Sequence, residues 1–257
     1  MSTEQQDVQV STEGSILVIT LNRPQARNAI TLPVAQAIAA AVDELDGNDA
    51  LAVGIITGAD GVFCAGMDLK GFVDGELPQL PGRGFAGIVQ APPAKPLVAA
   101  VEGYALAGGF EIALACDLIT AGRGARFGIP EVKRGLVAAG GALLRLPERI
   151  PPNVATQLAL TGEFLDAPRA HELGLVNALV EDGKALDAAL DLAAAIAVNG
   201  PLAVRASKRI IAEAPGWPRE ERWTRQEQIT DPVFVSHDAI EGASAFAEKR
   251  PPNWRGE

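Results

Sequence analysis

The stretch from Val98 to Glu131 constrains the fold more than any other part of the chain. An apolar run at residues 97–101 leads into the small residues 107–109, and the helix-forming residues 110–116 follow. Backbone N–H groups at a helix start have no internal partner and favour negative charge. Adjacent glycines let a ligand approach those groups closely. Because Glu111 follows on an otherwise apolar helix, the stretch predicts an anion-stabilising turn beside a carboxylate, which suits chemistry on acyl groups.

A second passage of the same kind precedes it. Residues 52–58 read as a buried strand, and residues 61–69 follow as a glycine turn and a helix start. The two turns, 65–68 and 107–109, each offer backbone donors, and two N–H groups from separate turns are what an oxyanion hole requires. The alternative is that glycines at strand ends only make tight turns.

Two carboxylates, Glu111 and Glu131, are the candidate acid–base groups. Glu131 follows a proline at a predicted helix start. Water addition to an activated double bond needs a base for the water and an acid for the carbon, and paired carboxylates can share those roles. Alternatively, Glu111 forms a buried ion pair with Arg134 or Arg145, and Glu131 is a first-turn glutamate favoured by the helix dipole.

Other nucleophiles and cations are weaker candidates. A Ser-His-Asp triad would have to use His171 or His237, which are expected on helices at or near the surface. Cys64 is expected to be a small buried residue rather than a nucleophile. Lys70, Lys249 and Arg250 are candidates for phosphate contacts, and the alternative for each is a solvated surface.

Charge and cysteine content exclude several classes of protein. The chain has 257 residues and a net charge of −10, which argues against nucleic acid or an anionic membrane as the main partner. No signal peptide is recognised, and no apolar run reaches about 18 residues without a charge. Cys64 and Cys116 show neither metal-ligand spacing nor a disulfide framework. We therefore expect a cytoplasmic protein without a metal site or a membrane association.

The order of predicted elements indicates an α/β fold. Strands at 15–21, 52–58, 97–101 and 117–121 alternate with helices, which favours a core of largely parallel strands. Helices dominate afterwards, at 153–161, 168–173, 184–198, 201–214 and 240–250. Gly200-Pro201 divides a core, 1–199, from a helical C-terminal region, 200–257. Residues 71–94, rich in Gly and Pro, are expected to form a mobile loop or lid.

These motifs together resemble the crotonase (enoyl-CoA hydratase/isomerase) superfamily, over nearly the whole chain. The matching segments are residues 22–24 with 28–29, 63–69, 103–111, 127–131 and 245–250. The resemblance implies a spiral of ββα turns followed by a helical C-terminal trimerisation region. It also implies a homotrimer or a homohexamer.

The resemblance also implies roles for particular residues. The oxygen of an acyl-CoA thioester would lie between the N–H groups of Met67 and Gly108, with Glu111 and Glu131 as the two hydratase glutamates. Coenzyme A is then part of the substrate, and no metal or redox cofactor is implied. Residues matched to acyl-CoA binding are Arg27, Ala65, Asp68, Lys70 and, from a neighbouring subunit, Lys249.

Two departures bear on the substrate. The usual triple glycine is Ala107-Gly108-Gly109 here, and residues 136–142 replace the commoner Pro-Gly-x-Gly-Gly-Thr stretch that flanks the acyl end. Segments 84–87, 108–111 and 252–255 also resemble carnitinyl-CoA dehydratases, which act on a quaternary-ammonium acyl group. With aromatic residues at 5%, a cage for such a cation is not evident.

The sequence thus favours an enoyl-CoA hydratase, a hydro-lyase that adds water reversibly across the 2,3 double bond of an enoyl-CoA. Three alternatives remain open: a carnitinyl-CoA dehydratase-like hydro-lyase, an enoyl-CoA isomerase that uses one carboxylate, and a non-catalytic acyl-CoA-binding protein.

Overall fold

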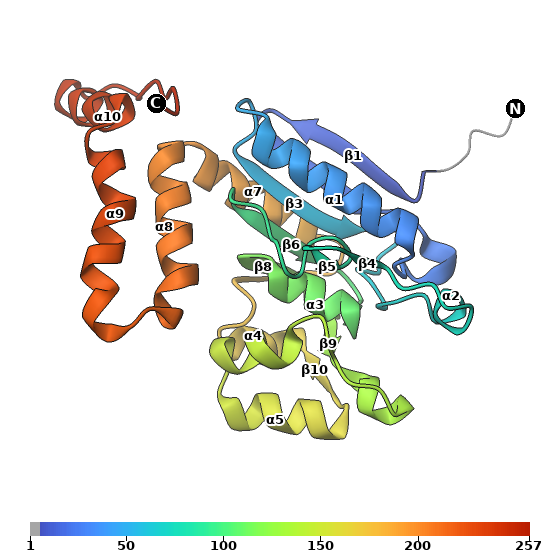
Figure 1. Cartoon of the computed structure of the whole chain (residues 1–257). Helices are drawn as coiled ribbons and strands as arrows, with labels where there is room; N and C mark the ends of the chain where they lie inside the picture. Colours follow the sequence, from blue (N-terminus) through green and yellow to red (C-terminus); the bar gives the residue numbers. More distant parts are fainter. Residues whose placement is uncertain (1–5) are drawn as a thin grey trace, which may run out of the picture.

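The computed structural model describes residues 6–257, and its centre is a six-stranded sheet (Figure 1). The strand order is β1-β2-β3-β6-β8-β11, with parallel pairing throughout except for the antiparallel hairpin of β1 and β2. The strands are β1 (Val8–Glu13), β2 (Ile16–Leu21), β3 (Val53–Gly58), β6 (Leu97–Val101), β8 (Leu118–Gly122) and β11 (Ala178–Val180). The predicted α/β class and each strand predicted for this sheet are confirmed.

Both faces of this sheet are covered by helices. Successive residues of β2 point to opposite sides, so Leu17 packs into the cluster under α1 (Leu32–Gly47) and Val18 into the cluster under α7 (Ala185–Ala197). Strands buried on both faces carry continuous apolar runs rather than an alternating pattern. This burial is why the strands could be recognised as unbroken hydrophobic stretches.

A second layer of short parallel pairs turns the chain into a spiral. After β6 the chain forms β7 (Tyr104–Leu106) and then α3 (Gly108–Ala115), and after β8 it forms β9 (Arg126–Gly128). β7 pairs with β9, and isolated bridges join Cys64 to Ala105 and Ile30 to Met67. Each turn therefore runs from the main sheet to the second layer and then into a helix or a helical turn. The predicted spiral of ββα turns is confirmed.

The remaining elements surround this spiral. β10 extends β9 and β7 to a three-stranded sheet, and β4 pairs with β5. Their bounds are α2 (Leu69–Val73), β4 (Gln79–Leu80), β5 (Gly84–Phe85), α4 (Ala142–Arg149), α5 (Pro152–Thr161), β10 (Phe164–Asp166) and α6 (Ala167–Glu172). In the described part of the chain, 3-10 helices are η1 (Pro24–Ala26), η2 (Pro130–Arg134), η3 (Ala214–Gly216) and η4 (Arg219–Glu221).

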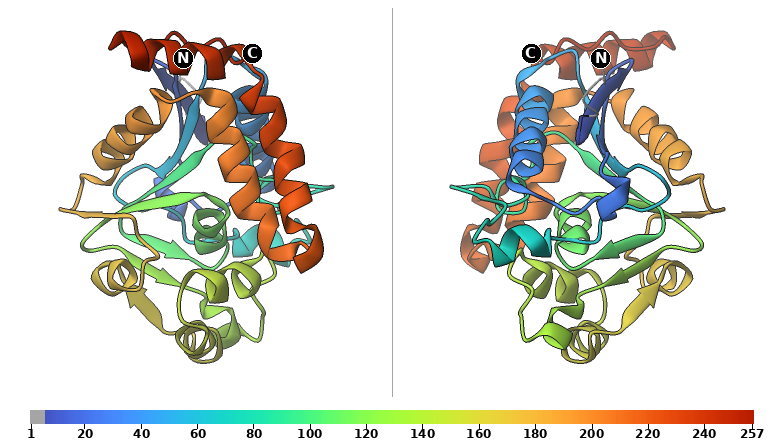
Figure 2. Two further views of the ribbon diagram at one scale, coloured as in Figure 1. Left: turned by 90° about the vertical axis from the view of Figure 1, so that its left-hand side faces the viewer. Right: turned by 90° about the vertical axis from the view of Figure 1, so that its right-hand side faces the viewer.

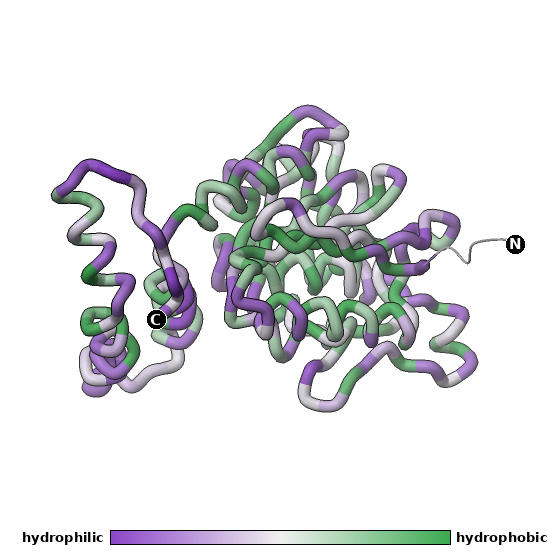
Figure 3. The backbone as a smooth tube through the Cα atoms, turned by 90° about the horizontal axis from the view of Figure 1, so that it is seen from above, coloured by the Kyte–Doolittle hydropathy of each residue, from purple (hydrophilic) through white to green (hydrophobic). Residues whose placement is uncertain are grey.

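Three helices, α8 (Pro201–Glu213), α9 (Arg222–Phe234) and α10 (His237–Glu248), project from one side of this body. Figures 1 and 2 show α8 beside α9, with α10 lying across their end. Figure 3 shows apolar and polar residues alternating along this projection, whereas apolar segments gather inside the main body. α8 begins at Pro201, at the predicted boundary. The division of the chain into 1–199 and 200–257 stays a prediction. Residues 1–5 of the first part lie outside the described residues.

Lys208 links the projection to the core, because its Nζ lies 2.7 Å from the Asp117 carboxylate and donates to the Lys95 carbonyl at 2.9 Å.

A membrane span requires a long and strongly apolar helix, and the helices within residues 6–257 differ from this pattern. None qualifies alone, and one sharply bent pair, Ala185–Ala197 with Pro201–Gly216, qualifies by length and composition only.

The prediction of a lid over residues 71–94 is wrong for the second half of that segment. Phe85, Ala86, Ile88 and Val89 are buried in the main core. Gly87 makes this packing possible, because a Cβ there would lie 2.6 Å from the Ala35 carbonyl oxygen on α1. Gly87 therefore serves close packing rather than mobility, and the apolar residues around it were the feature that indicated burial.

Candidate active site

The two glycine turns lie side by side at the ends of neighbouring spiral turns. The Cys64 N–H donates to the Tyr104 carbonyl at 2.8 Å, and the Leu106 N–H donates back to the Cys64 carbonyl at 3.0 Å. A Cβ on Gly66 would lie 3.1 Å from the Gly108 nitrogen. The residue before Met67 therefore touches the Gly108 amide, and the two turns form one continuous rim.

The N–H groups of Met67 and Gly108 are both available on this rim. The flanking residues of Met67 use the backbone of Ile30, and no protein acceptor within residues 6–257 takes a hydrogen bond from either N–H. Gly108 is the first residue of α3, where the helix dipole favours negative charge. Ala107 precedes it at φ 51°, in the left-handed region that favours glycine, so this turn carries backbone strain. The pair has the chemistry of an oxyanion hole.

Glu111 is held by backbone donors rather than by an ion pair. Glu111 lies on the first turn of α3, and the residue is only 4% exposed. Oε1 accepts hydrogen bonds from the N–H groups of Gly140 at 2.6 Å and Ala142 at 3.2 Å. In the described part of the chain, neither Arg134 nor Arg145 forms the alternative salt bridge with it.

Burial raises the pKa of Glu111 to about 7. The two N–H donors oppose this rise, whereas the charge of Glu131 adds to it. Burial also raises the pKa of Glu131, partly offset by its own backbone N–H and by Arg134. The charge of Glu131 therefore reaches the Glu111 carboxyl, as in the paired carboxyls that serve as acid and base in enzymes.

The Oε2 atom of Glu131 is buried and has no hydrogen-bond partner among residues 6–257. Glu131 does lie in the first turn of η2, as the helix-dipole alternative requires. A favourable dipole does not explain a buried oxygen without a donor, because such an atom costs free energy unless a ligand or water satisfies it. Glu131 therefore has one oxygen free to bind a reactant.

Arg23 fixes the first turn, a role that the sequence did not reveal. Its Nη1 donates to the Ala29 carbonyl at 2.6 Å, and Nη2 lies 3.2 Å from the Asp68 carboxylate. Asp68 in turn caps α2 by accepting from the Lys70 N–H at 3.1 Å. Partial burial would raise the pKa of Asp68, but these hydrogen bonds lower it below its ordinary value. The Asn-Arg-Pro motif at residues 22–24 was the available signal.

The residues matched to acyl-CoA binding divide into two groups. Arg27 and Ala65 are adjacent, because the Ala65 N–H donates to the Arg27 carbonyl at 3.0 Å, and exposed Lys70 follows on α2. Lys249 is the C-cap of α10, and Figure 1 places α10 and α2 at opposite ends of the molecule. One chain therefore does not bring Lys249 to the others, and its role from a neighbouring subunit stays a prediction.

The alternative nucleophiles find no support. Burial raises the pKa of Cys64 to about 12, so its thiol stays protonated near neutral pH. His171 Nδ1 lies 2.8 Å from the Val176 carbonyl oxygen, and His237 begins α10 on the projection. Among residues 6–257 no three His, Cys, Asp or Glu side chains are grouped as metal ligands.

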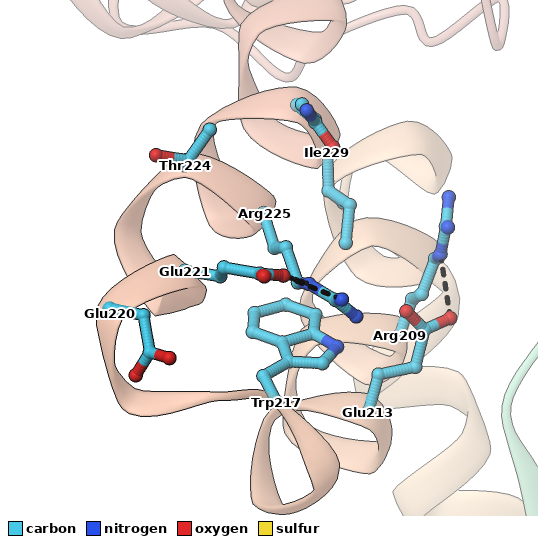
Figure 4. Close-up of a pocket in the computed structure, with 9 residues that line it drawn as sticks. Arg209, Glu213, Trp217, Glu220, Glu221, Thr224, Arg225 and Ile229 are labelled. Carbon is cyan, nitrogen blue, oxygen red and sulfur yellow. Dashed lines mark hydrogen bonds and ion pairs between the residues drawn. The ribbon is translucent and has the colours of Figure 1, made fainter.

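A cleft between α8 and α9 lies apart from this site. Figure 4 shows Trp217 in it, beside the ion pairs of Arg209 with Glu213 and of Arg225 with Glu221. None of the predicted site residues lines this cleft. It has no part in the arrangement of the glutamates and the glycine turns.

Comparison with known proteins identifies similar chains over their full length. The sequence model of the enoyl-CoA hydratase/isomerase family matches residues 11–257. The chain is 44% identical to enoyl-CoA hydratase EchA19 of Mycobacterium tuberculosis, over 97% of this chain and 96% of that one. It is 39% identical to carnitinyl-CoA dehydratase of Proteus mirabilis, over 98% and 99%. A crystal structure of enoyl-CoA hydratase from Mycobacterium tuberculosis H37Rv matches with a TM-score of 0.97 and 59% identity, over 98% and 100%.

Proposed function

The chain belongs to the enoyl-CoA hydratase/isomerase family, and from this premise we propose that it is an enoyl-CoA hydratase. The reaction is the reversible addition of water across the 2,3 double bond of an enoyl-CoA thioester. The observation that carries the proposal is a pair of carboxyls whose pKa values burial raises, Glu111 and Glu131, together with the N–H groups of Met67 and Gly108, which no acceptor within residues 6–257 takes up. An isomerase moves one proton with one carboxylate, and a binding protein needs neither.

We assign each bond change in this reaction to one of these groups. The thioester oxygen accepts from the Met67 and Gly108 N–H groups, and a water molecule lies between Glu111 and Glu131. As the water oxygen bonds to C3, the electrons of the double bond move toward the thioester oxygen, where the two donors stabilise the enolate. One carboxylate takes a proton from the water, and the other carboxyl gives a proton to C2. The pair begins and ends with one proton.

Two nearby cations bear on the choice of acyl group. The charges of Arg134 and Arg145 reach the Glu131 and Glu111 carboxyls, respectively. A quaternary ammonium on the acyl chain would meet these like charges, which disfavours it. We therefore infer an uncharged enoyl-CoA as the preferred substrate. The carnitinyl-CoA dehydratase relative makes the ammonium-bearing enoyl-CoA the second candidate.

An enoyl-CoA panel tests this proposal. Hydration removes the conjugated thioester, so we expect its absorbance to fall when the protein is mixed with an uncharged enoyl-CoA. The trimethylammonium-bearing enoyl-CoA should react more slowly at the same concentration. A double-bond shift without water incorporation would indicate an isomerase, and saturable acyl-CoA binding without turnover would indicate a binding protein. Faster turnover of the ammonium substrate would favour the second candidate.

Coenzyme A would be held by its phosphates near Arg27 and Lys70, as part of the substrate. This reaction requires no metal or redox cofactor. The cytoplasmic location and the lack of a membrane or nucleic-acid partner stay predictions based on composition and charge.

We propose a homotrimer or homohexamer in which α8–α10 pack on neighbouring subunits. The support is apolar exposure on these helices: Phe246 is 87% exposed, Phe234 76% and Trp223 73%. Large contiguous apolar surfaces on a soluble protein mark interaction sites. Light scattering at micromolar concentration should give the mass of three or six chains, and a monomeric mass would contradict the assembly.

A further inference from the structure

Arg145 is a partly buried cation that the proposed mechanism leaves without a role. It lies one turn into α4, and its Nη2 donates to the Val89 carbonyl at 2.6 Å. No carboxylate within residues 6–257 forms a salt bridge with it, although the charge of Glu111 is the strongest favourable influence on its guanidinium. A cation withdrawn from water in this way is costly, so its contacts call for an explanation.

On one side, Arg145 holds the turn that contains Phe85. The N–H groups of Ile88 and Val89 both donate to the Phe85 carbonyl at 3.3 Å, so the Val89 carbonyl and the Phe85 ring belong to one tight turn. The edge of the Phe85 ring occupies the place that a Cβ on Gly108 would take. Fixing Val89 therefore fixes the ring that packs against the Gly108 donor.

On the other side, Arg145 braces the loop that holds Glu111. Its backbone N–H makes the ordinary helical hydrogen bond to the Gly141 carbonyl at 3.0 Å, and its Nη1 lies so close to Gly141 that a Cβ there would collide with it. Gly140 and Ala142, the two neighbours of Gly141, supply the N–H groups that Glu111 accepts. The guanidinium thus contacts both the turn beside the oxyanion donors and the loop beside the carboxylate.

We propose that Arg145 is a positioning residue, which sets Glu111 relative to the Gly108 donor by tying the Phe85 turn to the start of α4. This inference rests on the proposed hydratase activity. The charged and titratable groups that face Arg145 are Glu111, Cys116 and, on its own helix, Glu148 and Arg149. Glu111 faces Glu131 as well. Burial raises the pKa of Glu111 most strongly, and Arg145 is among the groups that lower it.

The experiment compares Arg145→Gln and Arg145→Lys with the parent protein in the enoyl-CoA hydration assay. Misplacing a catalytic group by a fraction of an ångström to 1 Å is costly, so Arg145→Gln should lower kcat about 10- to 100-fold with KM little changed. One limb of the pH profile of kcat/KM reports the ionisation of Glu111. In Arg145→Gln this limb should move to higher pH, because the variant lacks a positive charge that lowers the pKa of Glu111. Arg145→Lys should restore the position of that limb and part of kcat.

Arg149→Gln is the matched control. Arg149 lies one turn further along α4, donates to the Cys116 carbonyl at 2.7 Å, and interacts electrostatically with Cys116, Asp117, Arg145 and Glu148. Its removal should leave the limb in place. If the parent protein hydrates enoyl-CoA and Arg145→Gln changes neither kcat nor the position of the limb, the positioning role of Arg145 is wrong. An equal shift of the limb in Arg149→Gln would also overturn this role. So would a failure of Arg145→Lys to restore the limb. A parent without hydration activity would instead contradict the proposed function.

Discussion

We expect Glu111→Gln and Glu131→Gln each to hydrate enoyl-CoA about 100- to 10,000-fold more slowly than the parent protein, because each removes a group that transfers a proton. Glutamine keeps nearly the same shape, and its carbonyl can still accept from Gly140 and Ala142 in place of Glu111 Oε1. Folding and acyl-CoA binding should therefore survive. The double variant should lose much less than the product of the two losses, because residues that act as a unit are not additive.

Glu102→Gln is the control for these variants. Glu102 also accepts a hydrogen bond from a distant backbone N–H, that of Ala185 at 2.9 Å, and within residues 6–257 its carboxylate has no hydrogen bond to Met67, Gly108, Glu111 or Glu131. Its variant should turn over at close to the parent rate. If Glu111→Gln hydrates at the parent rate, the two-carboxylate mechanism is wrong for this chain. Loss in only one of the two variants, together with a double-bond shift, would point to an isomerase.

Removing the Gly108 N–H should have the next largest effect. Loss of one donor from an oxyanion hole typically lowers kcat by about 100- to 1,000-fold. Gly108→Pro removes this N–H, and proline is tolerated at the first position of a helix such as α3. We therefore expect a folded protein with a loss in that range, measured as kcat at saturating enoyl-CoA.

The structure adds a necessary control to this experiment. Any Cβ at position 108 meets the Phe85 ring, so a substitution there disturbs packing whether or not the N–H is kept. Gly108→Ala introduces the same Cβ and retains the N–H. The ratio of the hydration rates of Gly108→Pro and Gly108→Ala therefore gives the effect of losing the N–H group alone. Equal rates in the two variants would show that the reaction does not use the Gly108 N–H.

Much of the fold could be predicted because local composition and burial agree. The apolar runs of β3 and β6 are buried on both faces, and α7 carries alanines at the positions that pack on the sheet. α4 was missed, since a pair of glycines precedes it and Pro147 lies inside it. The buried turn at Phe85 was missed because its glycines suggested mobility, while their actual role depends on α1, far away in the sequence.

The site divides in the same way. Glu111 and Gly108 could be recognised because strand, turn and helix follow one another in the sequence. The donors of Glu111 could not be, because Gly140 lies 29 residues away and its N–H is a backbone group with no residue signature. Arg23 and Arg145 act through carbonyl oxygens, which any residue supplies. Contacts of this kind depend on the fold, and no local sequence pattern predicts them.

The burial of Glu111 also affects how well the chain stays folded at different pH values. Its carboxyl titrates at about 7 in the folded protein, against an ordinary value of 4.5. A carboxyl whose pKa rises on folding holds its proton more tightly in the folded state. Its contribution to the free energy of unfolding is therefore fully present below about pH 4 and is lost as pH rises through 7, a difference of about 3 kcal/mol.

The parent chain should accordingly lose resistance to urea between acidic and neutral pH, in the range where Glu111 becomes charged. Glu111→Gln cannot titrate, so its advantage in unfolding free energy over the parent should grow across that range. An advantage that does not change with pH would mean that the folded protein solvates this carboxylate well. An advantage that grows with pH would instead show that the folded state tolerates the ionised form of Glu111 poorly, although turnover depends on this residue.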